Sequence, residues 1–297
     1  MKSHSVTIAA AFCAALLALS ASGVESASAR PDAHGPATAT ELRRQVTEDL
    51  GDPVADTQWE EVRGYLRSHP GDLAGTEALA QRLYGATMSV RLNGVDHTLT
   101  GSEAQSIMSQ RAVVPAGAKL KTVYSIQSVP VDAFSVSFAW LPSPIVNGKR
   151  YLAAIGGWDF RDDYVNGSDP DDMASIRLEI PGCYEMSNEQ IQVLDYTYTH
   201  HDAAGYLYDA GVGTHAPVWG IRDTTSGFVM NADNGQVELG LQAFCGPYSP
   251  SGQFTYEHNQ DGGSVAGVSA SWNGFSVSYS GSPARLQRSS GISTYNW

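Results

Sequence analysis

The segment of residues 228–245 constrains the fold of this chain most, because apolar and polar side chains alternate along it. The apolar positions after Asn234-Gly235 are Val237, Leu239, Leu241, Ala243 and Cys245. A period of two predicts a β-strand with one face in the core and one face in water. Since Asn-Gly readily adopts the positive φ of a type I′ turn, we expect a β-hairpin that turns at Asn234-Gly235.

Similar alternation recurs throughout the chain beyond residue 120. The expected strands cover residues 134–140, 151–155, 176–180, 190–199, 218–221, 268–272 and 275–279. No helical crossover pattern separates these segments, which favours antiparallel pairing. About ten strands at this spacing predict a mainly β protein built on an antiparallel β-sandwich.

The region before the strands has helical periodicity instead. Apolar residues recur every three or four positions from residue 40, and a short hairpin is expected over residues 88–100. We therefore predict a small helical N-terminal subdomain with one hairpin over residues 40–112, followed by a β-sandwich domain over residues 113–297.

The N-terminus resembles an export signal. Lys2 precedes an apolar run over residues 6–19, and Ala27-Ser28-Ala29 matches a cleavage site. These features predict a signal peptide over residues 1–29 and a flexible arm over residues 30–39. The apolar run is too short for a stable membrane anchor, so we expect a secreted, extracellular protein.

Charge and cysteine content narrow the range of partners. The formal net charge is −13, which argues against nucleic acid and anionic membranes as partners because both require a positive surface. Export would leave Cys183 and Cys245, which we expect to form a disulfide bond in an oxidising compartment. Closing so long a loop would contribute about 4 kcal/mol to stability.

An acidic segment is the strongest metal-binding candidate in the sequence. Its six aspartates are Asp159, Asp162, Asp163, Asp169, Asp171 and Asp172. Carboxylate oxygens on a turning loop are typical calcium ligands, although the spacing is not that of an EF-hand. The alternative is an acidic loop that remains solvated. A second candidate combines His200, His201, Asp202 and His215 for zinc or copper, against the more usual outcome of solvent-exposed loop histidines.

Aromatic residues beside turns indicate a binding function. Tyr206, Tyr208, Trp158 and Tyr164 stand next to glycine or polar residues. Rigid aromatic surfaces bind sugar faces and protein hot spots. Our principal hypothesis is therefore a secreted, disulfide-bonded β-sandwich that binds a glycan or a protein, with calcium ordering the acidic segment.

Two other functions are consistent with the sequence. Glu238 and Glu257 would form the carboxylate pair of an extracellular polysaccharide hydrolase if they shared one sheet face. The small and serine-rich strands over residues 264–282 resemble the membrane hairpins of pore-forming toxins, but each arm is short for a membrane strand. Common catalytic motifs are absent from the sequence, and the sequence alone does not decide whether the protein is an enzyme.

Overall fold

The structure, a computed structural model, describes twelve ranges of the chain within the compact unit Thr38–Trp297. These are residues 53–111, 122–123, 132–144, 150–161, 164–165, 171–180, 184–211, 213–226, 229–243, 249–260, 262–281 and 284–296. The predicted signal peptide and flexible arm, the boundary at residue 112, and Cys183 and Cys245 lie outside the described residues. The signal peptide, the domain boundary and the disulfide bond stay predictions.

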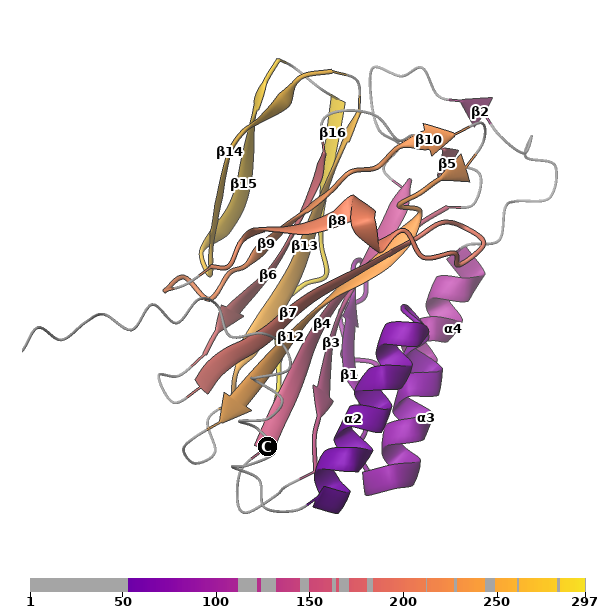
Figure 1. The fold of residues 1–297 in the computed structure, drawn as a ribbon, viewed down its shortest axis with the longest axis vertical. Coiled ribbons are helices and arrows are strands. Elements are labelled where there is room, and N and C mark those ends of the chain that lie inside the picture. Colours follow the sequence, from indigo (N-terminus) through magenta and orange to yellow (C-terminus); the bar gives the residue numbers. More distant parts are fainter. Residues whose placement is uncertain are drawn as a thin grey trace, which may run out of the picture. The chain divides into compact units, whose positions relative to one another are not determined.

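Among the described residues, three helices precede most of the strands (Figure 1): α2 (Pro53–Ser68), α3 (Leu73–Tyr84) and α4 (Gly101–Arg111). The strands are β1 (Ser89–Leu92), β2 (Thr122–Val123), β3 (Phe134–Pro142), β4 (Arg150–Phe160), β5 (Tyr164–Val165), β6 (Asp172–Glu179), β7 (Tyr184–Leu194), β8 (Gly205–Asp209), β9 (Val218–Ile221), β10 (Thr225–Ser226), β11 (Val229–Met230), β12 (Asn234–Ala243), β13 (Ser251–Gln260), β14 (Ser264–Ser271), β15 (Gly274–Ser280), β16 (Ala284–Ser289) and β17 (Ser293–Thr294). A 3-10 helix, η1 (Asp202–Ala204), precedes β8. The mainly β, antiparallel fold with N-terminal helices is confirmed.

Two large sheets form the sandwich. The first sheet has the order β1-β3-β4-β12-β7, and the second has the order β16-β13-β6-β9-β8, with β17 also paired to β13. Their facing side chains form one core that includes Val237 and Leu239 of β12, Ile176 of β6, Trp219 of β9 and Phe254 of β13. The alternation in the sequence therefore correctly identifies Val237, Leu239 and Ile176 as residues that face this core.

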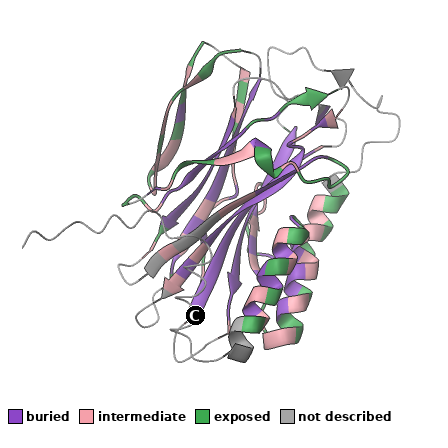
Figure 2. Cartoon of the chain, viewed as in Figure 1, coloured by how far each residue is buried: buried purple, intermediate pink, exposed green. Residues whose placement is uncertain are grey.

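Each sheet is also covered on its outer face. Helices α2, α3 and α4 lie on the first sheet, where Leu66 and Leu73 share a buried cluster with Leu141 and Ile155. The β14–β15 hairpin packs on the second sheet through Val277, which lies against Met173 and Val218. Figure 2 shows the result: the strands between these coverings are mostly buried, while exposed residues gather on the helices and the hairpin.

The predicted hairpin at Asn234-Gly235 is wrong. Both residues belong to β12, which is paired with β4 on one side and β7 on the other. A Cβ atom on Gly235 would collide with the Trp158 ring and the Gln192 carbonyl oxygen. The glycine is needed here because the neighbouring strands pack closely against it, and not because the chain turns.

The prediction that the polar face of this strand is solvated is also wrong. Glu238 is fully buried because helix α2 covers it, and Arg63 of that helix donates a hydrogen bond from Nε to Oε1 at 2.6 Å. The Nε atom of Arg67 lies 3.6 Å from Oε2 of Glu238. Gln236 beside it donates from Nε2 to the Leu66 carbonyl oxygen at 3.0 Å. These polar contacts join the helices to the middle of the first sheet.

Replacing Glu238 by Gln should lower the free energy of unfolding by about 3 kcal/mol or more, because two arginines would lose the buried anion that compensates their charge. Chemical denaturation would measure the change. The matched control is Glu61→Gln on α2, the helix that carries Arg63. This change breaks an exposed ion pair with Arg82 and should cost about 0.5 kcal/mol or less. Equal losses in the two variants would show that the buried contact does not anchor the helix.

Candidate functional site

A tight turn after β7, residues 195–199, presents two tyrosines, and we call it the tyrosine turn. The predicted strand over residues 190–199 ends at Leu194, so the prediction is wrong for its last five positions. The Asp195 Oδ1 atom accepts hydrogen bonds from the Thr197 amide at 2.8 Å, the Thr197 hydroxyl at 2.6 Å and the Thr199 amide at 3.1 Å. A side chain that captures nearby amides in this way competes with strand pairing and reverses the chain.

Both tyrosines of the turn are solvent-exposed. Tyr196 has 46% of its surface exposed and Tyr198 has 68%. Tyr198 also has a φ of 61°, a backbone conformation that residues other than glycine rarely adopt. Strained backbone of this kind costs about 1–3 kcal/mol and is concentrated at binding and catalytic sites.

The turn forms one wall of a small pocket, which we call the tyrosine pocket. Its volume is about 90 Å³, and its described lining residues are Pro70, Gly71, Gln105, Met108, Ser109, Trp158, Asp159, Tyr196, Tyr198, Asp233, Asn234 and Gly235. Other lining residues come from the α2–α3 connection and from α4. Gln236 fixes that connection, because its Oε1 atom accepts a hydrogen bond from the Gly71 amide at 3.2 Å.

The polar groups of the tyrosine pocket favour a ligand that donates hydrogen bonds. Its lining includes two aspartates, Asp159 and Asp233, and the amide residue Asn234. Asp233 is 5% exposed and Asn234 is 8% exposed, and the Asn234 Nδ2 atom donates to the Asp195 carbonyl oxygen at 3.4 Å. None of the described lining residues is Lys, Arg or His. Carboxylates accept hydrogen bonds from hydroxyl groups or pair with cations, whereas an anionic ligand would be repelled.

Asp195 is held in its charged form by the turn that it organises. Burial by itself raises the pKa of Asp195, but the hydrogen bonds from the Thr197 hydroxyl, from His201 and from the Thr199 and Thr197 amides outweigh burial and lower the pKa to about 2. Asp195 therefore stays deprotonated from weakly acidic to neutral pH, and the hydrogen bonds that place both tyrosines persist over that range.

Two of the predicted site residues, Trp158 and Asp159, do line the tyrosine pocket. Trp158 is 2% exposed, so most of its ring belongs to the core. Tyr196 and Tyr198 were not predicted as site residues, because their alternation resembled one face of a strand. The signal that could have identified them is the run Asp195-Tyr196-Thr197-Tyr198-Thr199, in which an Asp precedes two Thr residues that can cap a turn.

Tyr206 and Tyr208 lie on β8, at the edge of the second sheet. Tyr208 is 43% exposed, as a binding residue would be. Tyr206 is only partly buried, but its hydroxyl donates a 2.7 Å hydrogen bond to the Asp171 Oδ2 atom and its ring lies 4.9 Å from the Arg222 guanidinium carbon. The strand β8 thus offers one exposed aromatic ring outside the tyrosine pocket.

Tyr164 and Asp172 belong to a buried polar network at one end of the core. The Asp172 Oδ2 atom accepts a hydrogen bond from the Tyr256 hydroxyl at 2.8 Å and lies 2.8 Å from His258 Nδ1. The Tyr164 hydroxyl lies 3.0 Å from His258 Nε2, and Tyr164 is fully buried. Burial raises the pKa of Tyr256, and the charges of Asp172 and Asp223 raise it further, so its hydroxyl remains a donor.

The described aspartates of the predicted calcium segment have three different surroundings. Asp159 lines the tyrosine pocket, Asp171 contacts Tyr206, and Asp172 contacts His258. Asp162, Asp163 and Asp169 lie outside the described residues, so the calcium site stays a prediction. Among the described residues, the one group of three or more His, Cys, Asp and Glu side chains with metal-ligand spacing is Asp172, Asp223 and His258.

The histidine candidates do not form such a group in the described part of the chain. His200 Nδ1 lies 3.3 Å from Asp202 Oδ1, and His201 Nε2 lies 3.1 Å from Asp195 Oδ2. His215 adopts a φ of 51° in the segment before β9. His200 and His201 therefore contact aspartates in and just after the tyrosine turn, whereas His215 lies apart from them in the chain and has backbone hydrogen bonds with Gly211 and Leu178.

Glu238 and Glu257 lie in different sheets. Glu238 faces helix α2, as described above. Glu257 of β13 lies on the outer face of the second sheet, where it accepts a hydrogen bond from Gln287 Nε2 at 2.9 Å and pairs with Arg285 at 3.5 Å. Burial raises the pKa of Glu257, partly offset by Arg285. The structure does not bring the two carboxylates together on one face.

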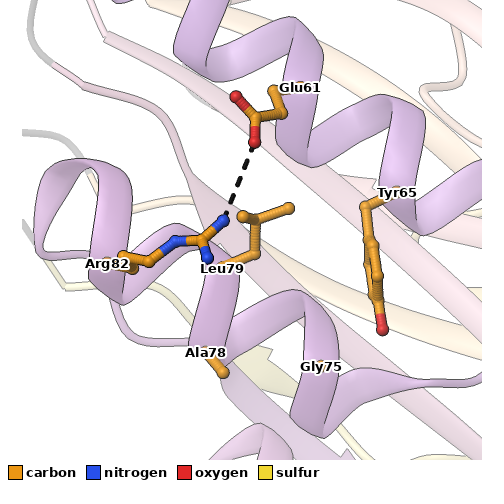
Figure 3. A pocket seen from close by; sticks show the side chains of 6 residues that line it. All are labelled: Glu61, Tyr65, Gly75, Ala78, Leu79 and Arg82. Atoms are coloured by element: carbon orange, nitrogen blue, oxygen red, sulfur yellow. Dashed lines mark ion pairs between the residues drawn. The ribbon is translucent and has the colours of Figure 1, made fainter.

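A larger recess of about 550 Å³ lies between α2 and α3 (Figure 3). Glu61 and Arg82 form an ion pair across it at 3.8 Å, and the Tyr65 hydroxyl donates to the Asp72 Oδ2 atom at 2.6 Å. The apolar part consists of small or aliphatic side chains such as Ala78 and Leu79. The polar groups named here pair with one another.

Comparisons with known proteins add little about function. No protein-family model matches the chain, and no curated protein matches it. Among solved structures, the C-terminal domain of the antigen I/II-family protein AspA of Streptococcus pyogenes is 7% identical, with a TM-score of 0.27, over 52% of this chain and 53% of that one. The collagen-binding domain of the Erysipelothrix rhusiopathiae surface protein RspB is 10% identical, with a TM-score of 0.16, over 54% and 64%. Each match spans less than two thirds of the neighbour's length, and the similarity is too low to support an argument.

Within the described residues, no helix is both long enough and apolar enough to cross a membrane.

The pKa of Asp195 can be tested directly through the amides that it binds. Because the folded pKa of about 2 lies below the ordinary value of about 3.9, the turn should be fully stabilised above about pH 4 and should lose that stabilisation as the pH falls through about 2. An NMR pH titration of the Thr197 and Thr199 amide signals should have its midpoint near 2. In Asp195→Asn the same signals should no longer titrate. A wild-type midpoint near 3.9 would show that these hydrogen bonds do not hold the carboxylate.

Proposed function

We propose that this protein is a secreted, extracellular binding protein whose tyrosine pocket receives one residue of a polymeric ligand, with a glycan as the first candidate. The observation that carries the proposal is the pair of exposed tyrosines, one of them in a strained conformation, beside two carboxylates in a pocket. Such an arrangement combines aromatic surface with directed hydrogen bonding.

The size of the tyrosine pocket supports a polymer over a small molecule. Pockets that enclose a drug-sized ligand measure roughly 300–1,000 Å³, whereas this one measures about 90 Å³. It has space for part of one ring or one side chain. The remaining affinity would come from surface outside the pocket, where Tyr196 and Tyr198 present their exposed rings.

The chemistry of the lining favours a glycan. Sugar hydroxyls donate to carboxylates such as those of Asp159 and Asp233, and sugar faces stack on tyrosine rings. A protein ligand that inserts a Lys or Arg side chain is the second candidate, because the same carboxylates and the net charge of −13 attract cations. Calcium ordering of the acidic segment that begins at Asp159 is part of the proposal.

Changing either Tyr196 or Tyr198 to Ala should raise the Kd for the ligand about 5- to 30-fold, which corresponds to about 1–2 kcal/mol of lost ring contact. The measurement is retention of the purified protein on insoluble polysaccharides and on immobilised basic proteins, with calcium and with chelator, followed by titration with the retained ligand. Assay of released sugar in the same samples tests for hydrolysis. If wild-type protein is retained on neither material, the proposed function is wrong.

The matched control is Tyr208→Ala, which removes from β8 a ring about as exposed as that of Tyr196 and should leave the Kd unchanged. Loss of binding in Tyr208→Ala alone would place the site on β8 instead. Tyr198→Gly separates binding from folding. It should weaken binding while leaving the free energy of unfolding unchanged or up to about 1 kcal/mol higher, since glycine adopts a φ of 61° without strain.

A further inference from the structure

Three potential metal ligands converge at one end of the core between the two sheets. Asp172 is the first residue of β6, Asp223 follows β9 by two positions, and His258 lies on β13. These strands are neighbours in the second sheet, because β6 pairs with β13 on one side and with β9 on the other. His258 lies on the same face of β13 as Phe254 and Tyr256, which both belong to the core.

The three side chains are buried and close together. Asp172 and His258 are 0% exposed and Asp223 is 3% exposed. One ligand atom from each lies within 4.8 Å of the others. His258 Nδ1 is 2.8 Å from Asp172 Oδ2 and 4.0 Å from Asp223 Oδ2. Ligands that share a tetrahedral ion at about 2.1 Å lie about 3.4 Å apart, so the two observed distances bracket the required one.

The surrounding hydrogen bonds orient these groups as ligands are oriented in metal sites. A metal-bound histidine normally holds its second ring nitrogen in a hydrogen bond. Here Nδ1 faces the carboxylates, and Nε2 lies 3.0 Å from the Tyr164 hydroxyl. Asp172 accepts further hydrogen bonds from the Tyr256 hydroxyl at 2.8 Å and from the Asn259 amide at 2.7 Å. The ring of Phe160 packs edge-on against His258, with 4.9 Å between ring centres.

The composition of the group selects a class of ion. Calcium takes six to eight oxygen ligands, whereas this group offers one imidazole nitrogen and two carboxylates. One nitrogen and two oxygen ligands in a compact arrangement suit zinc and similar divalent transition metals. The two aspartates would neutralise the charge of such an ion with neutral His258 as the third ligand.

We infer that Asp172, Asp223 and His258 bind one divalent transition-metal ion of the zinc type. The ion joins β6, β13 and the segment after β9 at the end of the sandwich. Its role is structural, because all three ligand side chains are buried among the described residues. Since the ligands come from three separated parts of the chain, metal binding is coupled to folding of the second sheet.

The first test measures metal content and stability of the mature protein. The protein is unfolded with chelator, refolded with Zn²⁺ or Co²⁺ and dialysed. The expected result is one tightly held ion per chain and a higher midpoint of thermal unfolding than in protein refolded with chelator. Absence of a retained ion with both metals would overturn the inference.

Variants assign the site. Asp223→Asn should weaken metal binding about 100-fold or more, since even changes to outer hydrogen-bond partners cost 10- to 100-fold. Glu179→Gln, which changes an exposed carboxylate on the same strand as Asp172, should bind like wild type. His201→Gln should also bind like wild type, which tests the exposed histidines as a competing site. Unchanged affinity in Asp223→Asn contradicts the inference.

A measurement on wild-type protein applies if Asp223→Asn does not fold. In the Co²⁺-loaded protein, paramagnetic shifts of NMR signals report the position of the ion. The largest shifts should be those of the His258 ring and the Asn259 amide. Largest shifts at His200 or His201 would place the ion at the surface and refute the site.

Discussion

The buried contact between Glu238 and Arg63 links the two halves of this architecture. It lies where helix α2 crosses the middle of β12, and β12 is itself paired on both sides within the first sheet. An ion pair at this place constrains the position of the helix, because a shifted helix that still covered the sheet would leave the carboxylate buried without its arginine partner. The helices, the α2–α3 connection and the wall of the tyrosine pocket formed by Pro70 and Gly71 all depend on that placement.

Side-chain carboxylates organise both candidate sites, but in opposite environments. At the surface, Asp195 forms a turn by accepting amide and hydroxyl hydrogen bonds, and this turn displays Tyr196 and Tyr198. In the core, Asp172 is enclosed by His258 and Tyr256. The first arrangement exposes aromatic surface, and the second closes the end of the sandwich. The same residue type thus organises the proposed binding surface in one case and the core in the other.

Local patterns in the sequence predicted much of the fold. Alternation identified the strands around Phe134, Ile176, Trp219 and Val237, together with the face of each that enters the core. Alternation led to wrong predictions where the same polar pattern is compatible with two different structures. The Asn234-Gly235 pair fits a turn or a crowded strand, and a polar strand face fits either solvent or a charged helix. For the candidate sites, Trp158 and Asp159 were selected from the sequence, whereas Tyr196 and Tyr198 were assigned to a strand.

What the sequence determined by itself was the class of fold, because hydrophobic periodicity depends only on neighbours along the chain. It also identified the residue types from which a site could be built. Only the tertiary structure decided which residues meet: Arg63 with Glu238, the α2–α3 connection with the tyrosine turn, and Asp172 with Asp223 and His258. These contacts join positions far apart in the chain, and their geometry follows from how the layers pack against one another. Periodicity carries no information about that packing.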